Sequence, residues 1–384
     1  MTQKKVMSVA KTFARRGLVE GFFGPLWSMA HRSALFAFAA PRGMNTYVYA
    51  PKDDPYHRER WTTPYPAQKW RALSRLIRQA QAQRIDFVYG FHPGKGLCFS
   101  ATQPIQILLS KAERFYDAGV RTFAVLFDDI PSHLEHAIDR KRFAHSLARA
   151  EGTWLAEIQA RQPPSWRDVE WWICPSYYTP DPALARAFGR FEPEFLQSLA
   201  RHLPSRVPCF WTGPFVVSKR ITLAHVRKVA NELKHPLILW DNYPVNDLSM
   251  SDELHIGPLQ GRDPRLPEVV FGYLNNPLLQ EALSFIPLAT CFDYALKPEE
   301  YAAESSWQNI IRQRFGLKAV PQWQAIRAFS TVHQRAKQTQ RPIHLSPKER
   351  LHVTAAVNYI RENRHKDWAR ELRPWHRLMI KALQ

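Results

Sequence analysis

The amino-acid sequence predicts an α/β fold, a (β/α)8 TIM barrel followed by a C-terminal helical region. Three observations lead to this prediction. Eight short apolar segments recur up to about residue 295, amphipathic segments separate them, and polar residues follow nearly every apolar segment. An apolar run without alternation is typical of a strand buried on both faces, as in parallel sheets. A doubly wound open sheet is the alternative, but it gives no reason for polar groups after so many strands.

The expected strands and helices alternate along the chain. Strands are expected at 18–24, 46–50, 86–91, 123–127, 169–174, 209–212, 236–240 and 269–274. Helices are expected at 29–40, 66–84, 103–118, 134–160, 183–202, 223–233 and 279–293. Ser28 is suited to cap the first helix, and a proline pair at 163–164 ends the fourth. Right-handed crossovers between successive strands would close the barrel.

We expect three regions: a basic N-terminal lead-in at 1–16, the barrel at 17–295 and a helical appendage at 296–384. The appendage begins near Pro298. Its expected helices span 300–315, 322–338 and 347–364, and a basic, Trp-bearing tail follows them.

The composition is that of a folded, basic protein. Apolar residues make up 45% and aromatic residues 12% of the 384 residues, and the formal net charge is +19. Such a charge favours an anionic partner, for which an anionic glycan is one candidate, but an ordinary basic surface explains it equally well. The basic runs are short and scattered, so nucleic acid is disfavoured as a partner.

The four cysteines lie far apart without a CxxC pair, which favours buried free thiols over disulfides or metal ligands. The pair His133 and His136 is the nearest metal candidate, and its HxxH spacing is more typical of exposed helix histidines. No metal and no cofactor is therefore predicted. We see no signal peptide and no stretch long enough to span a membrane, so we expect a cytoplasmic protein.

The segment TFAVLFDDI, residues 122–130, is the centre of the prediction. Its apolar run ends directly in Asp128 and Asp129. Carboxylates are costly to bury unless they are paired or used, and catalytic groups collect at the C-terminal ends of barrel strands. The alternative is that one of the two aspartates caps a helix that follows Pro131.

If the strands form a barrel, one mouth collects a defined set of polar and aromatic groups. These are Glu20, Gly21, Lys52, Asp53, His92, Asp128, Asp129, Tyr178, Trp211, Thr212, Asp241, Asn242, Asp247 and Asn276. Carboxylates, amides, one lysine and aromatic rings suit a neutral, hydroxyl-rich ring. Phosphate chemistry would need a glycine-rich cradle or clustered arginines, and neither is present at this mouth.

Six segments then carry a family resemblance: VEGFFG, NTYVYAPKDDPYHR, FAVLFDDI, WTGPFVVSK, LWDNYPVND and LNNP. In this order they resemble glycoside hydrolase family 84, the O-GlcNAcases and the β-N-acetylglucosaminidases once called hyaluronidases. The resemblance covers about residues 17–292 and implies a (β/α)8 barrel. Two departures are visible: GFFG replaces the usual GFYG, and PSYY stands where the animal enzymes have a glutamate before the tyrosine.

The resemblance implies a retaining β-N-acetylglucosaminidase in which the 2-acetamido oxygen of the sugar attacks the anomeric carbon and forms an oxazoline. Asp128 would orient the acetamido group, and Asp129 would be the general acid and base. Tyr178 would bind the acetamido oxygen, and Trp240 would wall the acetyl methyl pocket. Five further positions match sugar-binding residues: Gly21, Lys52, Asn242, Asp247 and Asn276. The expected partner is a GlcNAc-bearing glycan, glycoprotein or other glycoconjugate.

A non-catalytic protein that binds glycans or nucleic acid on the same barrel is the competing hypothesis. The presence of both Asp128 and Asp129 argues against it, because a barrel that had lost catalysis would be expected to lose one of them.

Overall fold

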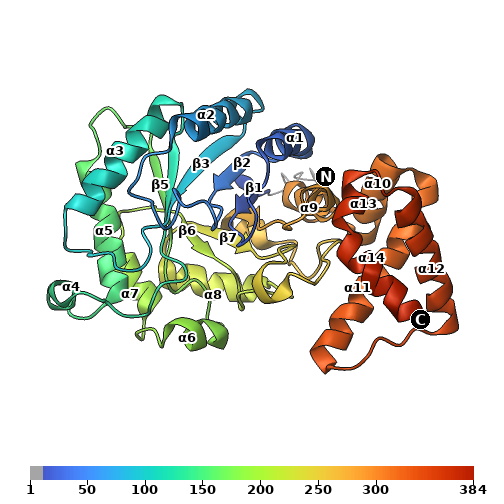
Figure 1. The fold of residues 1–384 in the computed structure, drawn as a ribbon. Coiled ribbons are helices and arrows are strands. Elements are labelled where there is room, and N and C mark those ends of the chain that lie inside the picture. The colour runs from blue at the N-terminus through green and yellow to red at the C-terminus, as the bar shows by residue number, and fades with distance from the viewer. Residues whose placement is uncertain (1–11) are drawn as a thin grey trace, which may run out of the picture.

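The computed structural model describes residues 12–384 and contains a closed barrel of eight parallel strands in the order β1 to β8. Helices surround the barrel, and the last helices form a separate group beside α9 (Figure 1). The predicted (β/α)8 barrel with a C-terminal helical region is confirmed.

All eight predicted strands are present. They are β1 Arg15–Glu20, β2 Thr46–Tyr49, β3 Asp86–Phe91, β4 Thr122–Leu126, β5 Glu170–Cys174, β6 Cys209–Trp211, β7 Leu237–Asp241 and β8 Val270–Asn275. The first was wrongly expected to run to residue 24. Its pairing begins at Arg15, opposite Gly272 of β8, and ends at Glu20, opposite Tyr49 of β2. Part of the expected lead-in is therefore strand, and its residues 1–11 lie outside the described residues.

The helices that cover the barrel are α1 Met29–Ala39, α2 Ala67–Ala82, α3 Gln103–Asp117, α4 Ala137–Arg142, α5 Leu147–Arg161, α6 Pro182–Phe188, α7 Phe195–His202, α8 Leu223–Leu233 and α9 Glu281–Leu296. Two predicted helices are each broken in two. Ala144 and His145 adopt left-handed φ angles of 51° and 63° between α4 and α5. Gly189 and Glu194, with φ of 99° and 55°, separate α6 from α7. Left-handed residues end a right-handed helix.

The barrel interior is a layer of apolar side chains, one from each strand. It contains Val19, Val48, Val88, Ala124, Trp172, Phe210, Ile238 and Leu274, all buried. The larger core lies outside the strands, where aromatic and aliphatic side chains pack against the helices. Strand residues alternate between these two cores, which is why both faces of every strand are apolar.

Two buried ion pairs join the outer face of the barrel strands to α1 and to the segment between β7 and β8. Glu20 of β1 binds Arg32 of α1, with 2.9 Å between Oε2 and Nε, and also accepts the Tyr47 hydroxyl. Asp241 of β7 binds Arg262 through two contacts, of which the Nε–Oδ2 distance is 2.8 Å. Both carboxylates are fully buried, so each needs its arginine.

The C-terminal region consists of α10 Ala303–Phe315, α11 Val320–Thr339, α12 Pro347–Glu362, α13 Asp367–Glu371 and α14 Arg373–Leu383. The tail that was expected to be basic and Trp-bearing, with no helix assigned to it, forms two helices, and Trp375 and Met379 of α14 are buried in the core of this region. All four cysteines are free thiols; three of them are buried as predicted, whereas Cys98 is half-buried. Among residues 12–384 no helix has the length and apolar character needed to cross a membrane.

The Glu20–Arg32 pair generates a stability prediction. Arg32→Met should lower the free energy of unfolding by about 3–5 kcal/mol, because it leaves the Glu20 carboxylate buried without a cation. Chemical denaturation measures this change. Glu20→Gln combined with Arg32→Met should recover part of the loss, and a single variant as stable as the parent would contradict the prediction.

Candidate active site

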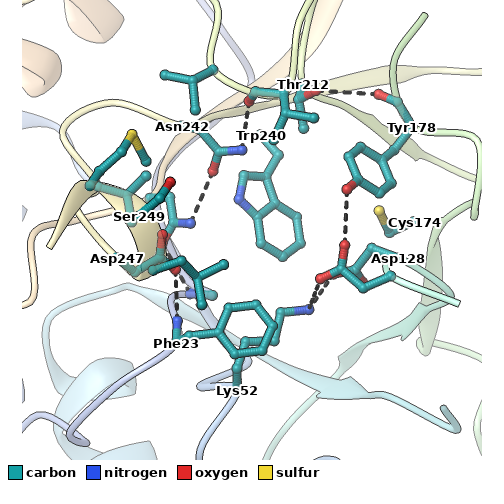
Figure 2. A pocket seen from close by; sticks show the side chains of 18 residues that line it. Phe23, Lys52, Asp128, Cys174, Tyr178, Thr212, Trp240, Asn242, Asp247 and Ser249 are labelled. Atoms are coloured by element: carbon teal, nitrogen blue, oxygen red, sulfur yellow. Dashed lines mark hydrogen bonds and ion pairs between the residues drawn. The ribbon is translucent and has the colours of Figure 1, made fainter. Parts of the chain in front are cut away.

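A cavity of about 270 Å³ opens at the C-terminal ends of the barrel strands. All nine predicted site residues line it: Gly21, Lys52, Asp128, Asp129, Tyr178, Trp240, Asn242, Asp247 and Asn276. Figure 2 shows the labelled side chains converging around Trp240. The volume is near the lower end of the roughly 300–1,000 Å³ range of small-molecule sites, which fits a single small ring.

Strand alternation explains why these residues meet. The inner layer of the barrel continues through Ala50, Leu126 and Trp240 toward the mouth. Residues two positions further along a strand point the same way, because the side-chain period of a strand is two. The cavity residues that follow an inward-facing apolar residue by two positions include Gly21, Lys52, Asp128, Cys174, Thr212, Asn242 and Asn276.

Asp129 breaks this alternation. Regular strand geometry would point it away from Asp128, but its backbone turns into the left-handed region with φ of 63°. Both aspartates therefore face the cavity. The alternative role as a helix cap is wrong, since α4 begins only at Ala137 and is preceded by His136, whose side chain makes no capping bond.

Asp128 is held as a carboxylate. Its side chain is 8% exposed, and its Oδ2 is bonded to the ammonium of Lys52. Burial is the largest single influence and raises the pKa of Asp128, but the charge and hydrogen bond of Lys52 together with the nearby His92 and His57 outweigh it, so the net pKa is lowered to about 2. Its Oδ1 has no hydrogen-bond partner among the described protein atoms. This Oδ1 is buried and lies 3.9 Å from Nε2 of His92, so the Asp128 carboxylate borders the cavity with part of its hydrogen-bonding capacity unused.

Asp129 has the opposite electrostatics. Its side chain is 20% exposed, and Lys52 Nζ lies 3.9 Å from its Oδ2. Burial and then the neighbouring Asp128 charge raise the pKa of Asp129, although Lys52 and the Tyr178 hydroxyl, which donates to Oδ1 at 2.9 Å, oppose the rise. Adjacent carboxyls whose pKa values are pushed apart are suited to different roles in acid–base chemistry.

Amide groups form the opposite wall. Asn276 accepts the Gly21 N–H at 3.3 Å and donates to Asn242 at 3.0 Å, and Asn242 donates to the Val216 carbonyl at 2.8 Å. Asp247 accepts the Phe23 N–H at 2.8 Å, and burial raises its pKa. This wall presents fixed donors and acceptors of the kind that bind sugar hydroxyls.

Trp240 forms the floor of the cavity and explains the glycine at position 21. A Cβ atom on Gly21 would lie 2.2 Å from Cζ2 of Trp240, a distance that real atoms do not reach. The glycine therefore allows the indole ring to lie close to the backbone directly after β1.

Five residues expected at the mouth do not line the cavity. Glu20 and Asp241 point outward to their arginines, and Trp211 packs outside the barrel with its indole N–H on His225 at 3.0 Å. Asp53 is exposed, and His92 lies behind Asp128 with Nε2 2.8 Å from the Asp128 carbonyl oxygen. For the first three, strand alternation applied residue by residue would have given the outward direction.

Sequence reasoning missed a set of mostly apolar residues that complete the cavity. They are Phe23, Cys174, Val216, Val217, Val245, Leu248, Ser249 and Met250. Most belong to loops whose backbone path the sequence did not define; Phe23 and Cys174 stood at inward positions of predicted strands. The exposed apolar residues Val217 and Leu248 were the available signal in the loops. His133 and His136 precede α4 rather than lying on it, and the described residues contain no group of three metal-ligating side chains.

A (β/α)8 barrel whose mouth holds two carboxyls of opposed pKa, an amide wall and a tryptophan floor defines the class of glycoside hydrolases. The family model described as beta-N-acetylglucosaminidase matches residues 16–331. The chain belongs to this family, which is glycoside hydrolase family 84.

The relatives and solved structures agree. The protein O-GlcNAcases of Rattus norvegicus and Mus musculus are each 32% identical, over 279 and 276 residues. These stretches cover 71% of this chain but 29% of each relative, so the chain matches under a third of their length. An O-GlcNAc hydrolase of Thermobaculum terrenum, solved as an aspartate-to-asparagine mutant, is 29% identical with a TM-score of 0.82, covering 96% of this chain and 81% of that one. The structure of CpGH84B is 26% identical with a TM-score of 0.74, covering 97% and 67%.

The Tyr178–Asp129 contact generates a titration prediction. The hydroxyl donates to the ionised carboxylate and so lowers the pKa of Asp129; Tyr178→Phe should therefore raise that pKa, by roughly one pH unit. Carbon-13 NMR titration of the aspartate carboxyls measures it. Asp247, whose bond to Phe23 is unaffected, is the internal control. A fall or no change at Asp129 would contradict the assignment.

Proposed function

We propose that this chain hydrolyses terminal β-linked GlcNAc with retention of configuration, and that the substrate's own 2-acetamido group is the nucleophile. Membership of the family and the resemblance to an O-GlcNAc hydrolase support the reaction. The observation that carries the mechanism is the pair of adjacent carboxyls that share Lys52. Because both arise from one strand end, they can act on neighbouring atoms of one sugar, whereas ordinary glycosidases place two carboxylates on either side of the scissile bond.

Asp128 is the orienting carboxylate in this proposal. Lys52 keeps it charged, and its carboxylate, which lines the cavity, accepts the acetamido N–H of the substrate. This bond turns the acetamido oxygen toward the anomeric carbon and stabilises the positive charge that develops as the oxazoline ring closes.

Asp129 is the general acid and then the general base. Its raised pKa favours a proton on the carboxyl, and in the first step that proton passes to the departing glycosidic oxygen while the acetamido oxygen bonds to the anomeric carbon. In the second step Asp129 takes a proton from water, which attacks the anomeric carbon and opens the oxazoline. Two displacements at one carbon return the original configuration.

The Tyr178 hydroxyl has a different hydrogen-bond partner in the free site and in the substrate-bound site. Burial first, and then the nearby aspartates, raise its pKa, so it remains a hydrogen-bond donor. In the free site it donates to Asp129. When substrate enters, the hydroxyl donates to the acetamido oxygen instead. Losing this bond raises the pKa of Asp129 further, so binding itself prepares the acid for its first step.

The remaining residues bind the ring. Trp240 walls the acetyl methyl pocket, and Asn242, Asp247, Asn276, Lys52 and the Gly21 backbone bind hydroxyl or acetamido groups. The cavity lining contains three carboxylates and one lysine. The net charge of the protein therefore does not extend to the cavity, which suits a neutral sugar. An anionic glycan would have to place its charge outside this cavity.

Aryl glycosides with phenols of graded pKa test the roles of the two aspartates. Without an acid, expulsion of the leaving group depends on its own basicity. Asp129→Ala should therefore give a steep dependence of kcat/KM on phenol pKa, with about 10²–10⁴-fold loss for the poorest leaving groups. Asp128→Ala should lose at least about 10²-fold for every phenol, with a slope like that of the parent.

Asp53→Ala is the matched control, since Asp53 is an exposed aspartate outside the cavity, and it should behave like the parent. The reverse pattern of slopes would mean that the two roles are exchanged. If Asp128→Ala and Asp129→Ala both kept the activity of the parent, the proposed active site would be wrong.

A further inference from the structure

The loop between β7 and β8, residues 242–269 and here called the β7–β8 loop, carries much of the cavity wall. Asn242, Val245 and Asp247 line the cavity near its start, followed by 248–250. A 3₁₀ turn, Leu248–Met250, ends this stretch. Within 242–252 no α-helix supports the backbone, so its position depends on contacts from elsewhere.

The barrel and its other loops hold the first residues, for example Asn242 and Asp247, and the C-terminal helices hold the residues that follow. Four side chains of this region donate to successive main-chain carbonyls of the β7–β8 loop, with the donors in reverse chain order. The pairs are Trp375 with Asp252, Ser330 with Leu254, Trp307 with Ile256 and Tyr301 with Leu259. The side chains of Leu254 and Ile256 are buried in the core of the helical region. This part of the loop therefore belongs structurally to the C-terminal helices.

A second cavity, of about 560 Å³, lies between the β7–β8 loop and α11. Polar groups on its wall already hold the structure together. Gln334 donates to Glu253 at 2.6 Å, the Tyr243 hydroxyl donates to the Gly257 carbonyl at 2.7 Å, and Arg262 is bound to Asp241. These polar groups of the second cavity are therefore already engaged in bonds that hold the structure together.

Lys337 of α11 makes the contact nearest to the sugar cavity. Its ammonium donates to the carbonyl of Ser249 at 2.6 Å, and Ser249 itself lines the cavity. The same ammonium pairs with Asp252 and lies 3.4 Å from Oε1 of Glu253. One lysine from the helical region therefore binds three groups of the β7–β8 loop, immediately after Asp247.

Neighbouring bonds fix the position of Glu253. His255 Nε2 lies 3.2 Å from Glu253 Oε2, and its Nδ1 lies 2.8 Å from the carbonyl of Val245. The hydrogen bond to His255 is the largest cause that lowers the pKa of Glu253 to about 2, and the bond to Gln334 and the charge of Lys337 act in the same direction. Glu253 is consequently charged at any ordinary pH and remains a partner for Lys337.

We propose that Lys337 is a positioning residue for the sugar cavity: by holding Ser249, Asp252 and Glu253 it fixes the β7–β8 loop, and so the C-terminal helical region sets the affinity of the site for its substrate. The inference rests on the proposed function for its kinetic part only. Asp247 and Asn242 would contact the sugar equally in the ground and transition states. Loosening the loop therefore raises KM and leaves kcat nearly unchanged.

The test compares Lys337→Met with Lys337→Arg and Lys348→Met. Methionine removes the ammonium but keeps the apolar stem, and arginine restores a donor that can pair with both carboxylates. Lys348 is exposed on α12 and has no ion pair or side-chain hydrogen bond among the described residues, so its substitution controls for the loss of one charge. Hydrogen exchange by mass spectrometry follows the peptide 245–256, and a neutral aryl GlcNAc substrate gives kcat and KM.

Lys337→Met should speed exchange in 245–256 and raise KM about 3- to 10-fold with kcat within about 2-fold of the parent, the scale of one partly exposed charged contact. Lys337→Arg should recover most of the change, and Lys348→Met should show none. Unchanged exchange, or faster exchange with unchanged KM, would overturn the inference. If the parent releases no GlcNAc, the proposed function fails, and the exchange experiment still decides whether Lys337 holds the loop.

Discussion

The constraint on which the site depends is the closed register of the eight parallel strands. Closure leaves each strand one inward direction, and the inner layer of Val, Ala, Trp, Phe, Ile and Leu side chains fills the barrel. Within the next two inward positions, seven of the eight strands, all except β3, supply a cavity residue, from Gly21 after β1 to Asn276 after β8. A shift of one residue in any strand would turn its cavity residue toward the helices. The apolar packing of the barrel therefore determines the geometry of its polar mouth.

Within that mouth the ion pair between Lys52 and Asp128 separates the two aspartates chemically. The lysine favours the ionised form of Asp128, and burial beside that charge favours the protonated form of Asp129. The left-handed backbone at Asp129 makes this possible, because it brings consecutive side chains to the same side of the strand. Lys52 and the left-handed φ of Asp129 thus give two adjacent aspartates different chemical roles: Asp128 is a hydrogen-bond acceptor, and Asp129 is an acid.

The apolar runs of the sequence predicted the eight strands, and the resemblance to glycoside hydrolase family 84 supplied the residues proposed to bind the sugar, all of which line the cavity. Glu20 and Asp241 were misplaced because strand ends were treated as polar groups without regard to alternation. The breaks at Ala144 and Gly189 could not be foreseen from amphipathic periodicity, which continues across a local backbone turn. The role of Lys337 depends on a tertiary contact, because Lys337 lies 88 residues from Ser249 in the sequence. Local sequence patterns therefore could not predict it.

Participation of the acetamido oxygen is the central claim, and changing its basicity tests it most directly. Aryl glycosides carrying N-acetyl, N-fluoroacetyl, N-difluoroacetyl and N-trifluoroacetyl groups differ mainly in how strongly fluorine withdraws electrons from that oxygen. If the oxygen attacks the anomeric carbon beside Asp128, kcat/KM should fall steeply with each added fluorine. A rate that stays constant across the series, or a glucoside with a 2-hydroxyl group hydrolysed as well as the GlcNAc substrate, would contradict substrate-assisted catalysis.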